Sequence, residues 1–165
     1  MDTIEQLKKF LHLQPHPNEG GYFAETYRSS ELINAHGGQR SLATAIYYLL
    51  TPDSFSAMHK VTGDEIFHFY MGDPVEMLML FPNGSSEIVI LGADVLTGMK
   101  PQHVAPGGVW QGSRLMKGGR YALLGTTMSP GFAYEDYAHG DQEKLMEQYP
   151  TQVEMIRALS SPMLK

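Results

Sequence analysis

The sequence has no cysteine, one tryptophan and few charged residues, and these shortages exclude several classes of protein. Without cysteine there is no disulfide, no catalytic thiol and no cysteine-ligated zinc site. Lys and Arg number 12 against 18 Asp and Glu, for a net charge of −6, and no basic run suits nucleic acid or an anionic membrane. No apolar run approaches the ~20 residues of a membrane helix. The N-terminus carries acidic residues and does not resemble a signal peptide, so we expect a cytoplasmic protein.

What is present indicates one folded domain over residues 1–165. Hydrophobic residues make up 42% of the 165-residue chain, which argues against disorder. A helix is predicted over residues 2–12, where Asp2 and Glu5 form a capping box and Ile4 and Leu7 recur at helical spacing. Short C-terminal helices are predicted over residues 140–160, with Asp141 as one cap.

Between these ends, apolar and β-branched runs alternate with turn signals such as Pro82-Asn83-Gly84. Nine strands are predicted, at residues 22–29, 42–50, 56–61, 65–71, 75–81, 87–91, 102–105, 108–115 and 121–128. Many short strands with helices only at the ends predict an all-β jelly roll spanning residues 20–138. A barrel of this size encloses one small ligand.

The segment from His59 to Gly72 resembles the first motif of the cupin superfamily, with Glu65 and Gly72 at the spacing of that motif. Residues 106–111 resemble the second motif, but Gln111 stands where the motif has histidine. A hairpin between adjacent antiparallel strands brings His59 and Glu65 to one face of the sheet. These two side chains are therefore the central candidates for chemistry.

The resemblance extends over about residues 5–150. It includes the segments Glu19–Arg28, Thr44–Leu50, 106–111 and 125–137, in the order found in the cupin-5 family. Membership of that family implies a double-stranded β-helix, usually a homodimer, and structural kinship to sugar-nucleotide epimerases and isomerases. It does not imply a settled reaction.

Three nitrogen or oxygen ligands with open positions hold a divalent metal, and this sequence supplies an incomplete set. His59, Glu65 and Gln111 are the candidate ligands, since Ala57 occupies the position of a second inward histidine. His68 is a fourth candidate only if a bulge turns it inward. Strand alternation instead places Glu65 inside and His68 outside.

Six further residues are candidates for binding a ligand, and each has a structural alternative. Arg40 and Arg114 suit phosphate recognition or ordinary ion pairing. Trp110 suits stacking on a ligand or packing in the core, and it alternates with Gln111, so both cannot face one cavity. Glu25 and Tyr27 share one face of a strand and line either a cavity, a dimer contact or a solvated surface.

Three functions follow as hypotheses. In the first, the protein is an isomerase or epimerase of a sugar phosphate or nucleotide sugar: His59 abstracts a proton, Glu65 orients it, and Tyr47 returns a proton from the other side. In the second, it is a metal-dependent cupin enzyme. In the third, it binds a small molecule without turnover. All three predict a small-molecule ligand, and none involves nucleic acid or a membrane.

Overall fold

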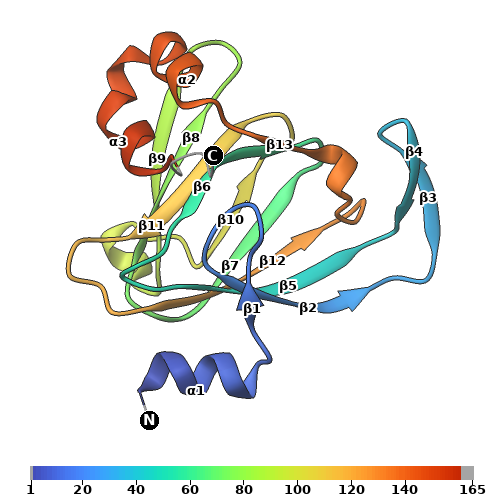
Figure 1. Ribbon diagram of the computed structural model, residues 1–165, viewed down its shortest axis with the longest axis horizontal. Helices are drawn as coiled ribbons and strands as arrows, with labels where there is room; N and C mark the ends of the chain where they lie inside the picture. The colour runs from blue at the N-terminus through green and yellow to red at the C-terminus, as the bar shows by residue number, and fades with distance from the viewer. Residues whose placement is uncertain (1, 161–165) are drawn as a thin grey trace.

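The computed structural model describes residues 2–160, and its strands form two stacked sheets and a small projecting arm (Figure 1). The six-stranded sheet runs in the order β1 (Gln14–Pro15), β2 (Tyr22–Arg28), β5 (Thr44–Leu50), β12 (Ala122–Met128), β7 (Glu65–Gly72) and β10 (Gln102–Ala105). The five-stranded sheet runs in the order β13 (Tyr137–His139), β6 (Ser56–Val61), β11 (Trp110–Leu115), β8 (Val75–Leu80) and β9 (Ser86–Leu91). Neighbouring strands within each sheet are antiparallel. The two sheets are separate and do not close into one continuous barrel.

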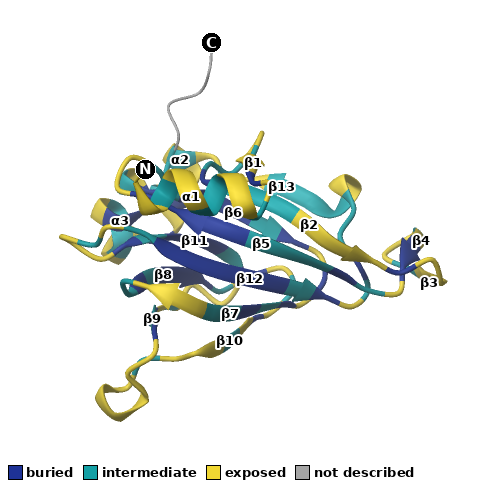
Figure 2. Ribbon diagram, turned by 90° about the horizontal axis from the view of Figure 1, so that it is seen from below, coloured by how far each residue is buried: buried dark blue, intermediate teal, exposed yellow. Residues whose placement is uncertain are grey.

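The core lies between the two sheets because alternate side chains of each strand point inward. On β12, Ala122 and Leu124 belong to this core, whereas Leu123 points to the opposite face. The β8 side chains Met77 and Met79 approach from the other sheet. The dark strands in the middle of Figure 2 mark this buried layer.

Helices cover the outer faces of both sheets. α1 (Thr3–Phe10) packs on the six-stranded sheet near Leu49 and Leu123, and α2 (Gln142–Gln148) and α3 (Val153–Ala158) pack on the five-stranded sheet (Figure 1). Short 3-10 turns, η1 (Val95–Thr97), η2 (Tyr134–Asp136) and η3 (Pro150–Gln152), complete the elements. Within residues 2–160, no helix has the length and apolar character needed to cross a membrane.

The helix starts predicted from capping residues differ in detail. Asp141 caps α2 through a hydrogen bond from the Lys144 backbone N–H to its carboxylate, as predicted. Asp2 is the N-cap of α1, but its side chain makes no capping hydrogen bond, and the helix ends at Phe10, short of the predicted residue 12.

All nine predicted strands are present, with ends that agree to within two residues. The arm formed by β3 (Leu32–Ala35) and β4 (Gly38–Ser41) was not predicted, nor were β1 and β13. The arm turns at His36 and Gly37, which have φ of 53° and 79°. That left-handed pair is typical of a two-residue hairpin, so the turn at His36-Gly37 is the sequence signal for the arm.

Candidate functional site

A cavity of about 100 Å³ opens at one end of the sandwich, where β2 and β12 end and β5 and β7 begin. It is much smaller than the ~300–1,000 Å³ of pockets for drug-sized ligands. Its wall combines apolar side chains with several carboxylates and one arginine. The lining residues are His16, Glu19, Phe23, Glu25, Arg28, Thr44, Ile46, Val61, Glu65, Thr126, Met128, Phe132 and Tyr134.

The predicted hairpin is wrong, because β6 and β7 belong to different sheets and the chain crosses from one sheet to the other between them. His59 and Glu65 therefore lie on facing sheets instead of one face, and both are buried, 1% and 8% exposed. Gln111 on β11 lies directly opposite His59 in the sheet register. Its side-chain Nε2 donates a hydrogen bond of 2.8 Å to Glu65 Oε2. Gln111 therefore links the two sheets by holding the Glu65 carboxylate from the opposite side.

One hydrogen bond fixes the protonation of the His59 ring. His59 Nδ1 lies 2.7 Å from the backbone oxygen of Ala57. Because a carbonyl oxygen only accepts, Nδ1 carries the proton, and Nε2 of the neutral ring has a lone pair. That Nε2 atom lies 3.4 Å from Glu19 Oε1. A single proton between His59 Nε2 and Glu19 Oε1 therefore gives both atoms a hydrogen-bond partner. The ring of Tyr137 stacks on His59 at a centroid distance of 5.4 Å and shields it.

Glu19 is the site residue that strand patterns could not identify, because it lies in the loop between β1 and β2. The loop can reach the site because Gly20 has φ of 92° and sits so close to the Phe55 backbone oxygen that a Cβ atom would clash. Ser56 Oγ donates to the other carboxylate oxygen, Glu19 Oε2, at 3.3 Å. The only sequence signal for this arrangement is the Gly-Gly pair that follows Glu19.

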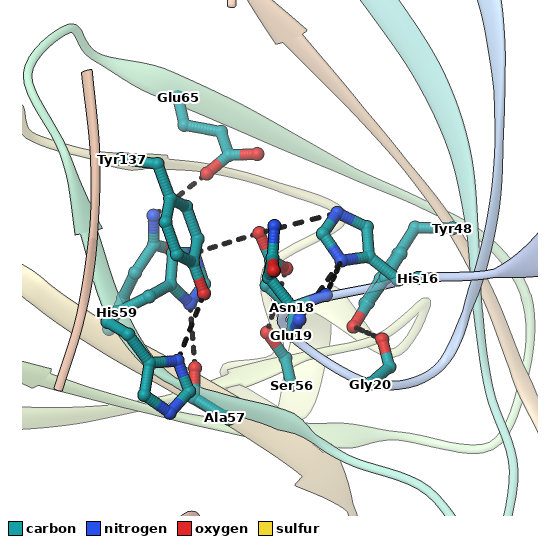
Figure 3. Close-up of polar contacts among 12 residues, drawn as sticks. His16, Asn18, Glu19, Gly20, Tyr48, Ser56, Ala57, His59, Glu65 and Tyr137 are labelled. Atoms are coloured by element: carbon teal, nitrogen blue, oxygen red, sulfur yellow. Dashed lines mark hydrogen bonds and ion pairs between the residues drawn. The ribbon is translucent and has the colours of Figure 1, made fainter. Parts of the chain in front are cut away.

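His16 stands on the other side of Glu19, as Figure 3 shows. Its Nδ1 accepts hydrogen bonds from the backbone N–H groups of Asn18 and Glu19, at 3.3 and 3.0 Å. The proton of the neutral ring is therefore on Nε2, which lies 3.8 Å from Glu19 Oε1. His16 and His59 thus present opposite tautomers to the same carboxylate oxygen.

Burial shifts the pKa values of the ionisable side chains around Glu19 so that their neutral forms are favoured. Desolvation raises the pKa of Glu19 and of Glu65, and the neighbouring Glu19 charge raises that of Glu65 further. Desolvation lowers the pKa of His59 and of His16. Two carboxyl groups with raised pKa values on one cavity wall are suited to acid–base chemistry near neutral pH.

Figure 3 shows the arrangement of the predicted catalytic residues, with Glu65 and His59 both on the side of Glu19 that is away from His16. His59 is not part of the cavity wall; it lies behind the carboxyl groups of Glu19 and Glu65, which are. Tyr47, predicted as the opposing proton donor, points away from the cavity and packs with the outer cluster below α1. The inward tyrosine of β5 is Tyr48, and its hydroxyl donates to the Gly20 oxygen at 2.6 Å. The prediction for Tyr47 was wrong because the inward parity of β5 was not established from sequence.

A β-bulge on β2 changes which residues face the cavity. Glu25 pairs with Ile46 and Tyr27 with Ala45, so Thr26 is an extra residue in the strand. Glu25 and Arg28 consequently share the cavity face, and their side chains are joined by two hydrogen bonds of 2.8 and 2.9 Å. Tyr27, expected beside Glu25, is instead exposed on the other face. Regular alternation failed here because of the bulge.

Three other predicted ligand-binding residues are engaged elsewhere. Arg40 forms a bidentate pair with Asp136, at 2.7 and 2.8 Å. Arg114 pairs with Glu76 at 2.6 Å and faces a surface beside η3 and α3. Trp110 packs in the cluster beneath α2 and α3 and under the Lys60 ammonium group. Only Gln111 of the Trp110–Gln111 pair is inside, as their alternation predicted.

The candidate metal ligands His59, Glu65 and Gln111 lie close together, but their contacts are with protein atoms. Within residues 2–160, no group of three or more His, Asp or Glu side chains is arranged to hold a metal ion. His68 lies on the outer face, 3.1 Å from Thr127 Oγ1, and the bulge on β7 occurs after it, at Tyr70. Gln111 presents its nitrogen, not its oxygen, to Glu65. The residues present therefore do not fit the metal site of the second hypothesis, and no chemical step here is assigned to a metal.

Comparison with known proteins agrees with this architecture. A structure from Leishmania major, described as a hypothetical protein, superposes with a TM-score of 0.90 at 34% identity and covers 98% of this chain and 100% of that one. A protein from Shewanella oneidensis gives a TM-score of 0.89 at 33% identity, with 98% and 99% coverage. An uncharacterized protein of Saccharomyces cerevisiae is 32% identical over 82% of this chain and 74% of its own length.

More distant structures share the fold alone. The Bacillus subtilis oxalate decarboxylase gives a TM-score of 0.55 at 14% identity, covering 89% of this chain and 37% of that one. A dTDP sugar isomerase from Desulfovibrio desulfuricans gives 0.53 at 14% identity, covering 73% and 85%. These likenesses confirm the predicted cupin jelly roll. The family model described as "Cupin superfamily (DUF985)" matches residues 5–140. The chain therefore belongs to the Cupin_5 family.

Proposed function

We propose that this protein is an acid–base isomerase or epimerase of a small carbonyl compound of the sugar type. The observation that carries the proposal is the buried contact of 3.4 Å between His59 Nε2 and Glu19 Oε1, behind a cavity whose wall also contains the Glu65 carboxyl. The catalytic residues expected from sequence were His59, Glu65 and Tyr47. The geometry adds Glu19 and moves His59 from the reacting surface to a position behind it.

The hydrogen bonds assign different roles to the two carboxyl groups. Glu19 in its protonated form donates to the His59 Nε2 lone pair, so this group is the acid. Glu65 accepts a hydrogen bond from Gln111 Nε2, which fixes its carboxyl group on the cavity wall, and we assign it as the base. One ionised and one protonated carboxyl group on a single wall is the pairing that general acid–base catalysis requires.

The reaction balances without a further reactant. Glu65 takes the proton from the carbon next to the substrate carbonyl, and the Glu19 proton passes to the carbonyl oxygen, which gives an enediol. For isomerisation, Glu19 then takes the proton of the neighbouring hydroxyl group while Glu65 returns its proton to the adjacent carbon. For epimerisation, Glu19 takes its proton back from the former carbonyl oxygen while a water molecule protonates the original carbon on its other face, and Glu65 gives its proton to the hydroxide that is left. His59 is a positioning residue that holds the Glu19 proton between turnovers.

Solvent exchange tests the proposal. In D2O, proton NMR of a panel of aldoses and ketoses, free and phosphorylated, is expected to show protein-dependent loss of the signal next to the carbonyl. Glu65→Gln and Glu19→Gln should each slow this exchange by about a hundredfold or more. Glu143→Gln, on the exposed surface of α2, is the matched control and should leave it unchanged.

His59→Gln separates positioning from direct proton transfer. This variant should retain part of the exchange but shift its dependence on pH, because the Glu19 proton loses its partner. If a sugar binds saturably but no sugar of the panel exchanges its proton in the presence of the protein, the proposal is contradicted. That result would favour a binding protein without turnover.

A further inference from the structure

The cavity wall contains one arginine and no lysine among the lining residues of the described chain, and that arginine is already paired. Arg28 Nε and one terminal nitrogen donate to the two oxygens of Glu25, at 2.9 and 2.8 Å. The other terminal nitrogen lies 3.3 Å from the Phe132 backbone oxygen and 3.5 Å from Ser41 Oγ. The two-pronged edge with which arginine holds phosphate is therefore occupied by Glu25.

The remaining charges on the wall do not favour an anion. Glu19 and Glu65 present carboxyl groups, and the other lining side chains are mostly apolar or hydroxylated. Arg40, the other arginine predicted to bind phosphate, forms a bidentate pair with Asp136. A phosphate dianion placed here would approach up to three carboxyl groups and find no free cation, so its lost hydration would go uncompensated.

The same wall suits an uncharged polyhydroxy compound. Carboxyl oxygens accept hydrogen bonds from hydroxyl groups, while Phe23, Ile46 and Phe132 offer apolar contact to the C–H face of a sugar. The volume of about 100 Å³ also favours a compact ligand over a nucleotide sugar.

We infer that the cavity selects an uncharged sugar-type ligand against its phosphorylated form, and that Glu25 sets this selection by occupying the Arg28 guanidinium. The statement that this ligand is a substrate rests on the proposed function; the charge selection does not. It differs from the sequence-based expectation of a sugar phosphate or nucleotide sugar. Glu25 is a specificity residue in this account; it shares the cavity face with Phe23, and the Thr26 bulge brings Arg28 to the same face.

Titration with inorganic phosphate, followed by amide chemical shifts in two-dimensional NMR at low salt, tests the inference without requiring turnover. The wild-type protein should show no saturable shift at cavity residues. Glu25→Gln frees the Arg28 fork and should bind phosphate at least about tenfold more tightly than the wild type, as one charge-assisted bidentate contact allows. Glu25→Gln combined with Arg28→Gln should lose that gain.

Glu31→Gln is the matched control, because it removes the same charge from an exposed position just after β2. The inference is overturned if wild-type protein binds phosphate at the cavity as tightly as Glu25→Gln, or if Glu31→Gln gains as much. A failure of sugar exchange in D2O overturns the proposed function but not this result, since phosphate binding is measured independently. Circular dichroism of each variant establishes that it is folded.

Discussion

The two histidines beside Glu19 differ in the backbone group that each Nδ1 meets. His59 Nδ1 faces the Ala57 carbonyl, whereas His16 Nδ1 faces two backbone N–H groups. His59 must therefore carry its proton on Nδ1 and His16 on Nε2. The consequence for Glu19 is a lone pair on one side and an N–H on the other, which localises its acidic proton toward His59.

Nitrogen-15 NMR of the imidazole rings checks these tautomers directly. At neutral pH, His59 should show protonated Nδ1 and unprotonated Nε2, and His16 the reverse. Because desolvation lowers the pKa of both rings, both should remain neutral at pH values where a free histidine, with a pKa of about 6.5, is half charged. A protonated Nε2 on neutral His59 would remove the acceptor that the proposed acid requires.

At the scale of single elements, the Thr26 bulge shows why part of the site could not be predicted from sequence. Strand β2 was expected, but a bulge has no reliable sequence signal, and one extra residue moves Arg28 to the cavity side and Tyr27 away from it. Alternation correctly predicted that Trp110 and Gln111 face opposite sides and that His68 faces outward. The prediction for Tyr47 failed because no residue of β5 had been assigned to the inner face from the sequence.

The Arg40–Asp136 pair ties β4 to η2, and η2 leads directly into Tyr137, which stacks on His59. The Arg40 guanidinium lowers the pKa of Asp136, so the pair stabilises the fold above the ordinary aspartate pKa of about 3.9 and loses this contribution as pH falls through the lowered value. Asp136→Ala should lower the melting temperature at pH 7 and disturb the resonances of Tyr137.

Asp73→Ala is the control for this element, because Asp73 pairs with Arg120, whose side chain is 80% exposed. Calorimetry should find a smaller drop in melting temperature for Asp73→Ala than for Asp136→Ala, since exposed pairs contribute little. Equal effects would show that the Arg40–Asp136 pair does not hold the wall of the site.

At the scale of the whole molecule, the positions of nine strands along the chain were predictable because turns and apolar runs alternate regularly. The resemblance to the cupin family predicted the jelly roll. The projecting arm was missed because its strands are short and apolar residues, Leu32 and Ile33, are exposed on both of its faces, so no alternation of buried and exposed positions marks it. Glu19 was missed for a different reason: a loop residue acquires its role only when the chain folds back onto β6.

The stability of the molecule should depend on pH through Glu65. Burial raises its pKa in the folded state above the unfolded value of about 4.3, so its neutral form stabilises the fold at low pH and this contribution is lost as pH rises through the raised value. Glu65→Gln is permanently neutral and keeps a hydrogen-bond acceptor for Gln111. Denaturant unfolding should show that the free energy of unfolding of Glu65→Gln gains on that of wild type as pH rises above the unfolded glutamate pKa of about 4.3.

Glu143→Gln, at an exposed position of α2, is the matched control for this measurement. A wild-type stability that falls no faster with pH than that of Glu65→Gln would mean that Glu65 ionises in the folded protein without cost.

Carbon-13 NMR titration of the Glu19 and Glu65 side-chain carboxyl groups tests most directly whether these groups and His59 share protons at neutral pH. We predict that both carboxyl signals titrate above the ordinary glutamate pKa of about 4.3, and that His59→Gln alters the Glu19 curve. If both signals titrate at the ordinary value and neither responds to His59→Gln, the cavity holds no acid–base pair and the proposed function is contradicted.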